Sequence, residues 1–286
     1  MGMNRKILLL IITLALLPAV PLPVFADSPL VMGVFPRRDA AQTREMFRPM
    51  ADHLAKKLKR EVQLIVPPDF PAFWSRLADG EFDLVHYNQY HYIKAHKLFG
   101  HRAILMNEEH GKNSLYSVIM VNADSPFQSL QQLRGHKILF GGGKGAMVSY
   151  IMALDLLRQG GLNEADYISD IALNPVAATR ALHYRQADAS SGSDTLLSMS
   201  DMPWQNGNPP RVLAKSEPVA HLPWAVTTEV SEEIASQIRE TLLALTQTAE
   251  GRRILSFAQL TALQPASDDD YAPHRAIVAR ALGEQY

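Results

Sequence analysis

The sequence contains no cysteine among its 286 residues. This absence excludes disulfides, thiolate catalysis, metal sites built on thiolates and a lipid-modified N-terminal cysteine. The chain also lacks an excess of either charge, with 28 basic against 29 acidic side chains, so nucleic acid is a poor candidate partner. What remains is an ordinary globular composition, long enough for one large domain or two of medium size.

Long apolar runs are scarce as well, and the only one that approaches a membrane span lies at the N-terminus. Arg5 and Lys6 precede the apolar run ILLLIITLALLPAVPLPV, which is followed by a small-residue cleavage pattern that ends at Ala26. This pattern predicts a secretory signal peptide, residues 1–26, with a mature chain that begins at Asp27 outside the cytoplasmic membrane. The alternative is an uncleaved anchor, which the prolines and the short apolar core disfavour.

Two successive α/β units are predicted in the mature chain. Apolar runs and helical periodicity predict strands over 30–35, 61–66 and 81–87, with helices over 43–58 and 69–80 between them. This order predicts a mostly parallel sheet with helices on both faces. In the second unit we expect strands over 115–121, 137–140, 187–192 and 211–217, and helices over 125–135, 145–159 and 179–186.

Two such units predict a two-lobed α/β receptor that binds its ligand in the cleft. We expect one lobe over 27–115 and 219–286 and the other over 116–218. Because ligands sit beyond the carboxyl ends of strands in open α/β sheets, the segments 35–36, 67–70, 86–89, 141–147 and 189–192 are candidates for the cleft.

The stretch ILFGGGKGAMVSY, residues 138–150, looks like a phosphate-binding loop. A P-loop requires an earlier glycine and a hydroxyl residue directly after the lysine, whereas Lys144 is followed by Gly145. Glycine amides at a helix N-terminus nevertheless favour an anion. The alternative is a tight strand-to-helix turn without a ligand.

The order of motifs resembles the periplasmic phosphate, phosphite and phosphonate-binding proteins of ABC importers. The similarity is carried by GVFPRRDAAQTREMFRPMADHLAKKL, VPPDFPAFWSRLADGEFDLVHYNQYHYIKAH, SLYSVIMVNADSPFQSLQQLRGHKILFGGG, RQADASSGSD and VLAKSEPVAHLPWAV, over nearly all of the mature chain. It implies a type II periplasmic binding protein, with two lobes joined by two crossing strands, that closes on a small solute.

The family's binding residues match this chain unevenly. Tyr87 and Asp188 match family positions, but the aspartate–tyrosine pair is Asp69-Phe70 here. The Ser-Thr-Ser that grips phosphonate oxygens in the family matches residues 145–147, and the His-Glu pair matches residues 175–176, so these side chains are replaced. The resemblance therefore implies a retained scaffold with changed ligand chemistry.

The predicted ligand site combines the glycine loop with the strand ends that we expect opposite it. Its members are Phe35, Phe70, His86, Tyr87, Asn88, Gln89, Gly143, Lys144, Gly145, Ala146, Met147 and Asp188. For His86 and Tyr87 the alternative is packing, for Lys144 it is a solvated side chain, and for Asp188 it is a cap or hinge ion pair.

We therefore expect a monomeric receptor for a small anion that serves an inner-membrane ABC permease, with no cofactor and no resident metal. A periplasmic sensor for a membrane histidine kinase is the alternative. The sequence shows no nucleophile motif with a His-Asp arrangement, which disfavours a secreted enzyme. Histidines 86, 91, 96 and 101 recur every five residues, a spacing that does not suit a metal site on one helix face.

Overall fold

The computed structural model describes residues 28–36, 39–199, 202–204 and 207–286. The predicted signal peptide lies outside these ranges, so its cleavage stays a prediction. Within the described ranges, no helix is both long and apolar enough to cross a membrane.

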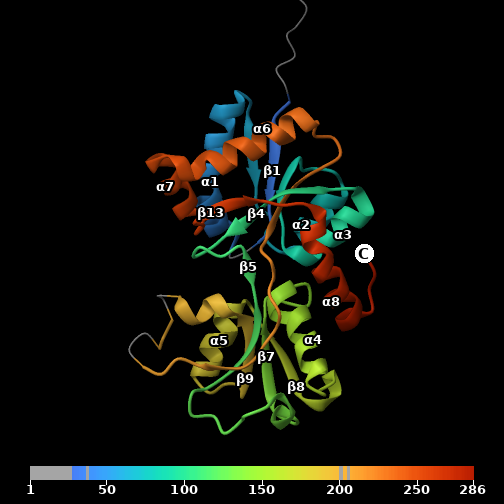
Figure 1. Ribbon diagram of the computed structural model, residues 1–286, viewed down its shortest axis with the longest axis vertical. Helices are drawn as coiled ribbons and strands as arrows, with labels where there is room; N and C mark the ends of the chain where they lie inside the picture. Colours follow the sequence, from blue (N-terminus) through green and yellow to red (C-terminus); the bar gives the residue numbers. More distant parts are fainter. Residues whose placement is uncertain (1–27, 37–38, 200–201, 205–206) are drawn as a thin grey trace, which may run out of the picture.

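Two separate sheets form two lobes, which lie one above the other in Figure 1. The first sheet has the order β13-β4-β12-β3-β1-β2, and the second has the order β10-β6-β9-β7-β8. The strands of the first are β1 (Leu30–Val34), β2 (Val62–Ile65), β3 (Leu84–His86), β4 (Arg102–Glu108), β12 (Pro223–Val226) and β13 (Ala262–Pro265). Those of the second are β6 (Ser117–Val121), β7 (Lys137–Gly141), β8 (Ile168–Ala172), β9 (Ala189–Ser193) and β10 (Arg211–Lys215).

The first sheet is mixed, with two parallel and three antiparallel strand pairs. β1 pairs in parallel with β2 and β3, so Met32 lies beside both Leu64 and Leu84. β12 and β4 add to this trio in antiparallel order, and β13 completes the edge. The prediction of a mostly parallel sheet is therefore right for the first three strands and wrong for the later ones.

The helices pack on the two sheets and between the lobes. Those of the first lobe are α1 (Ala40–Leu58), α2 (Phe70–Ala78), α3 (Gln89–Phe99), α6 (Glu232–Leu243) and α7 (Ala249–Phe257). The second lobe has α4 (Met152–Gln159) and α5 (Pro175–His183), and the C-terminal helix is α8 (Ala272–Leu282). Apolar side chains of α1, α6 and α7, among them Phe47, Ile238 and Leu255, share one buried cluster with Trp224 of β12.

Several predicted helices have different bounds in the structure; the helix predicted from residue 43, for example, begins at Ala40 after its Asp39 cap. Residues 125–135 form only the short 3-10 turn Leu130–Leu133, between Pro126 and Gly135, which adopts a left-handed φ of 79°. The helix predicted from Gly145 begins at Met147 with a π turn, Met147–Ile151, that leads into α4. The helix predicted from residue 179 is α5, which begins four residues earlier after its Asn174 cap.

The lobes are joined where two short strands cross. β5 (Ser114–Leu115) pairs antiparallel with β11 (Val219–Ala220), outside both large sheets. The Tyr271 hydroxyl donates to the His221 carbonyl at 3.0 Å and ties the second crossing segment to the C-terminal region. These crossings coincide with the predicted lobe boundaries, which themselves stay a prediction.

The C-terminal helix α8 contacts α3 of the first lobe and α4 of the second. Its Arg280 forms two hydrogen bonds with the buried Asp155 of α4, at 3.0 and 2.7 Å. In return, Arg158 of α4 donates to the carbonyls of Arg280 and Ala281 at the end of α8. The last helix therefore bridges the lobes beside the crossing strands.

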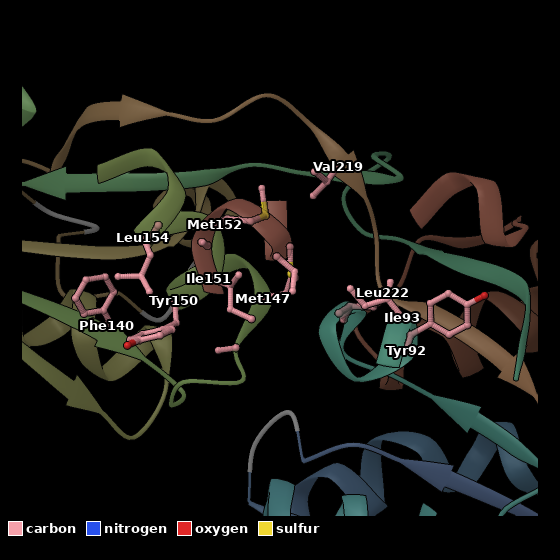
Figure 2. Close-up of a cluster of buried hydrophobic side chains, with 14 of the residues drawn as sticks. Tyr92, Ile93, Phe140, Met147, Tyr150, Ile151, Met152, Leu154, Val219 and Leu222 are labelled. Carbon is pink, nitrogen blue, oxygen red and sulfur yellow. The ribbon is translucent and has the colours of Figure 1, made fainter. Parts of the chain in front are cut away.

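A continuous apolar cluster also joins the lobes. It runs from Phe140 and Ile151 of the second lobe to Ile93 and Leu222 of the first. Figure 2 shows Met147 on the side of its helix nearer to Leu222 and Ile93. Met147 is fully buried, so the start of this helix is part of the contact between the lobes.

We predict that Asn107→Ala destabilises the first lobe. Asn107 is fully buried and accepts the Trp224 indole N–H at 2.9 Å, while the Trp224 ring stacks on His86 at 4.4 Å between centroids. Losing the acceptor leaves a buried donor unpaired, which costs about 1–3 kcal/mol of unfolding free energy. Urea unfolding measures the change, with Asn208→Ala at an exposed position as control. Equal stability of the two variants would contradict the prediction.

Candidate ligand-binding cleft

A cavity of about 920 Å³ lies between the lobes. From the first lobe it is lined by residues that follow β1, β2 and β3, and from the second by residues 142–149 and 173–175, which follow β7 and β8. Four of the five strand ends predicted to form the cleft are thus present. The fifth, 189–192, lies inside β9, and the segment after β8 lines the cavity instead.

Four helix N-caps line this cavity. Asp39, Asp69, Asn88 and Asn174 precede α1, α2, α3 and α5, and each accepts a hydrogen bond from an amide of its own helix. The distances lie between 2.8 and 2.9 Å. Because each parallel strand turns directly into a helix here, the positive ends of several helix dipoles converge on one space.

The helix that begins at Met147 differs from the other four because no side chain caps it. Its N-cap is Ala146, which has an extended backbone and no hydrogen-bonding side chain. The first amides of a helix have no acceptor within the helix, and those of Met147 and Val148 have no side-chain cap at Ala146 either. With the following α4 the helix runs from residue 147 to residue 159, long enough for a substantial dipole.

The glycine loop before this helix has a backbone that other residues would strain. Gly142 and Gly143 have φ values of 84° and 86°, in the left-handed region. A Cβ on Gly141 would lie 2.3 Å from Pro175, so glycine permits the close approach of α5. The Ser149 hydroxyl donates to the Gly141 carbonyl at 2.6 Å and fixes the loop on its own helix. Ser149 is therefore engaged in holding the loop.

The first lobe contributes a wall of aromatic side chains. The Phe70 ring stacks between Phe35, at 6.0 Å between centroids, and His91, at 4.7 Å and nearly parallel. Trp74 lies beside His91, with centroids 5.9 Å apart. All four side chains line the cavity, which makes this side more apolar than a site for a bare phosphate.

Two buried polar groups of α3 also line the cavity. Gln89 is fully buried and donates from Nε2 to the Ala220 carbonyl of β11 at 3.2 Å, while its Oε1 has no partner. His91 Nδ1 is likewise without a partner. Burial lowers the pKa of His91 to about 3, with a smaller contribution from Lys94, so this ring is neutral near pH 7.

Among the described residues that line the cavity, Lys144 carries the only positive charge. It is exposed at the tip of the glycine loop. Asp39 and Asp69 are the two carboxylates, and each is engaged as a helix cap. The positive potential that an anion needs therefore comes from helix amides and from Lys144 together.

The structure brings together nine of the twelve residues predicted for the site. The nine that line the cavity are Phe35, Phe70, Asn88, Gln89, Gly143, Lys144, Gly145, Ala146 and Met147. His86 is instead packed between Phe47 and Trp224, and Tyr87 is buried with its hydroxyl 2.5 Å from His101 Nδ1. Asp188 precedes β9, at the opposite end of the strand, and accepts from the Lys137 amide at 2.9 Å.

Sequence reasoning missed several residues of the cavity. Asp39 and Asn174 follow strands and precede helices, so the N-cap pattern contained the signal for both. Trp74 and His91 lie near the starts of α2 and α3, and the sequence does not show which face of these helices is turned toward the cavity. Leu222 comes from the second crossing segment, and no local pattern indicates its place in the cavity.

Comparison with known families adds a decisive observation to this geometry. A model of the family described as "ABC transporter, phosphonate, periplasmic substrate-binding protein" matches residues 32–271, most of the chain. The chain belongs to this family. Its fold is accordingly that of a two-lobed type II periplasmic binding protein, and the family is one of substrate-binding proteins for transport.

Solved structures with the same fold are similar over nearly their whole length. XAC2383 from Xanthomonas citri, bound to chloride, has 20% sequence identity and a TM-score of 0.77, with 89% of this chain and 98% of that chain covered. PhnD1 from Prochlorococcus marinus, in complex with methylphosphonate, has 16% identity and a TM-score of 0.75, covering 88% and 97%. The aliphatic sulphonate binding protein SsuA from Escherichia coli has 19% identity and a TM-score of 0.57, covering 87% and 85%.

We predict that His91 makes the folded protein less stable in acid. Below about pH 6.5 the unfolded chain binds a proton at this side chain, whereas the folded chain does not until its pKa of about 3. Stability contributed by the neutral ring is therefore lost as the pH falls through this window, by up to about 1.4 kcal/mol per pH unit. His101 and His274, with pKa values lowered by burial to about 4 and about 3, act in the same direction.

In His91→Phe the aromatic stack is kept and one titrating group is removed. The unfolding free energy of this variant should depend less steeply on pH between 6 and 4 than that of the unchanged protein. Urea unfolding at several pH values measures the slope, with His110→Asn at an exposed position as control. An unchanged slope in His91→Phe would show that the folded protein protonates this ring.

Proposed function

We propose that this protein captures a small oxyanion in the cleft between its lobes and delivers it, as a monomer, to an inner-membrane ABC permease. The main observation that supports this proposal is that no side chain caps the helix that begins at Met147, whereas side chains cap the other four helix starts in the cavity. The family description names a transporter component, which favours an importer over a sensor kinase.

Several properties of the cleft support an anion. Free amides at the start of a long helix bind negative charge, and Lys144 supplies an exposed positive charge in the preceding loop. The neutral His91 adds a polar group without charge. Two structural neighbours, named for a methylphosphonate complex and for aliphatic sulphonate, have anionic ligands in the same fold.

The same residues support a head group with fewer hydrogen-bond requirements than a phosphonate dianion. The hydroxyl triplet implied by the resemblance is replaced by Gly145, Ala146 and Met147, and Met147 is buried in the contact between the lobes. Each unpaired oxygen of a buried dianion costs about 1–3 kcal/mol. We therefore propose a singly charged head group, such as a sulfonate or carboxylate.

We expect thermal unfolding to distinguish these ligand classes. Methanesulfonate or acetate at saturating concentration should raise the melting temperature, because a ligand at one hundred times its Kd adds about 2.7 kcal/mol. Inorganic phosphate, methylphosphonate and 2-aminoethylphosphonate should raise it less, and choline should leave it unchanged. Stabilisation by choline alone would contradict the proposal that the ligand is an anion. Tight binding of 2-aminoethylphosphonate would contradict the proposal that the head group is singly charged.

Lys144→Ala should weaken the binding of the most stabilising anion about ten-fold, the lower range for a charge-assisted hydrogen bond. Isothermal titration calorimetry measures the affinity, and Lys97→Ala on the exposed side of α3 is the matched control. The loss should shrink at high salt, since the charge is exposed. Unaltered affinity in Lys144→Ala would mean that the glycine loop is a turn without a role in charge recognition.

A further inference from the structure

The volume and the lining of the cleft indicate that its ligand has more than a negatively charged head group. The cavity of about 920 Å³ lies near the upper end of the volumes usual for sites that bind organic ligands, about 300–1,000 Å³. A bare oxyanion at the start of the Met147 helix would leave most of this volume to solvent. The remaining lining is largely apolar, so the volume fits an organic body attached to the head group.

The apolar lining faces the cavity from both lobes. Phe70 and Trp74 of α2 line it from the first lobe and are only partly buried. From the second lobe comes Leu173, whose 88% exposure is the largest among the exposed large hydrophobic residues. A flat or compact apolar group placed in the cavity would cover the surface that these three side chains leave exposed.

Gln89 offers the ligand a hydrogen-bond acceptor, and the orientation of its side-chain amide is fixed. Its side-chain amide is oriented by the Ala220 carbonyl, which accepts from Nε2 at 3.2 Å, because a flipped amide would place two oxygens against each other. Oε1 is then a fully buried acceptor without a partner in the described chain. Such a group is satisfied only by a donor, and Gln89 is one of the residues that line the cavity.

We propose that the ligand is an organic anion with three parts: a head group for the helix at Met147, an apolar body for Phe70, Trp74 and Leu173, and a hydroxyl or amine that donates to Gln89 Oε1. This inference rests on the proposed function, because it adds the body and the donor to the anionic head group. It makes Gln89 the residue that discriminates among anions of equal charge.

A grid of probes tests the three parts separately. Sulfonates, carboxylates and phosphonates are each titrated as the methyl, phenyl and 4-hydroxyphenyl compound into the full protein by calorimetry. In the head-group series that binds best, the phenyl compound should bind about ten-fold more tightly than the methyl compound, and the 4-hydroxyphenyl compound about ten-fold more tightly again.

Two variants assign these gains to residues. Gln89→Met keeps the side-chain length and should abolish the gain from the hydroxyl, so that the 4-hydroxyphenyl and phenyl compounds bind this variant with equal affinity. Trp74→Ala should reduce the gain from the ring. The control is Gln131→Met, at an exposed position far in sequence from the cleft. Melting temperatures of all variants show whether Gln89→Met remains folded, and in the unchanged protein the grid alone tests the body and the donor.

The outcomes separate this inference from the proposed function. If the methyl, phenyl and hydroxyphenyl anions bind with equal affinity, the proposed apolar body and hydrogen-bond donor of the ligand are wrong, whereas the proposed anion site is not contradicted. A hydroxyl gain that survives in Gln89→Met would overturn the role of Gln89. Absence of binding in all three head-group series would overturn the anion site itself, and the inference with it.

Discussion

The antiparallel pairing of β5 with β11 is the constraint on which the cleft depends. Two strands of two residues each carry the main chain between sheets of six and five strands, and neither strand belongs to either sheet. Such short connections permit a change in the angle between the lobes while they fix which strand ends face each other. The carboxyl ends of β1, β2 and β3 therefore meet those of β7 and β8, and the cavity follows from this meeting.

The Gln89 side chain connects this constraint to the ligand. Gln89 lines the cavity and its Nε2 donates to the carbonyl of Ala220 in β11, so a ligand that pairs with Oε1 would be linked to the crossing strand through a single residue. A hydrogen bond between Gln89 and a ligand would orient both ends of this amide. Ligand occupancy and the position of the crossing strand are then coupled by a direct contact rather than by a long path through the fold.

The sequence predicts the scaffold better than the cavity, and particular residues show why. Strand and helix periodicity locates β1 to β3, and the glycine loop predicts a helix start at Gly145, two residues before the observed start at Met147, because both signals are local. His86 and Tyr87 were placed in the cleft from their position at the end of β3, but their side chains point into packed layers beside Trp224 and Phe73. The direction of these side chains is determined by residues more than a hundred positions away or on another element, so no local sequence pattern predicts it.

Gly145 and Met147 stand at positions where the resemblance implies hydroxyl side chains, and each has a consequence for the cleft. Gly145 allows His91 to approach, since a Cβ there would lie 3.1 Å from the imidazole ring, and Met147 fills the contact between the lobes with apolar surface. Burial of a methionine side chain contributes about 1.5–3 kcal/mol, which stabilises contact between the lobes without any ligand. A ligand in this cleft then has less closure to drive and fewer oxygens to satisfy, so its selection depends on the groups that remain unpaired. Among the described residues that line this cleft, those groups are the helix amides at Met147, the buried acceptor of Gln89 and Nδ1 of His91.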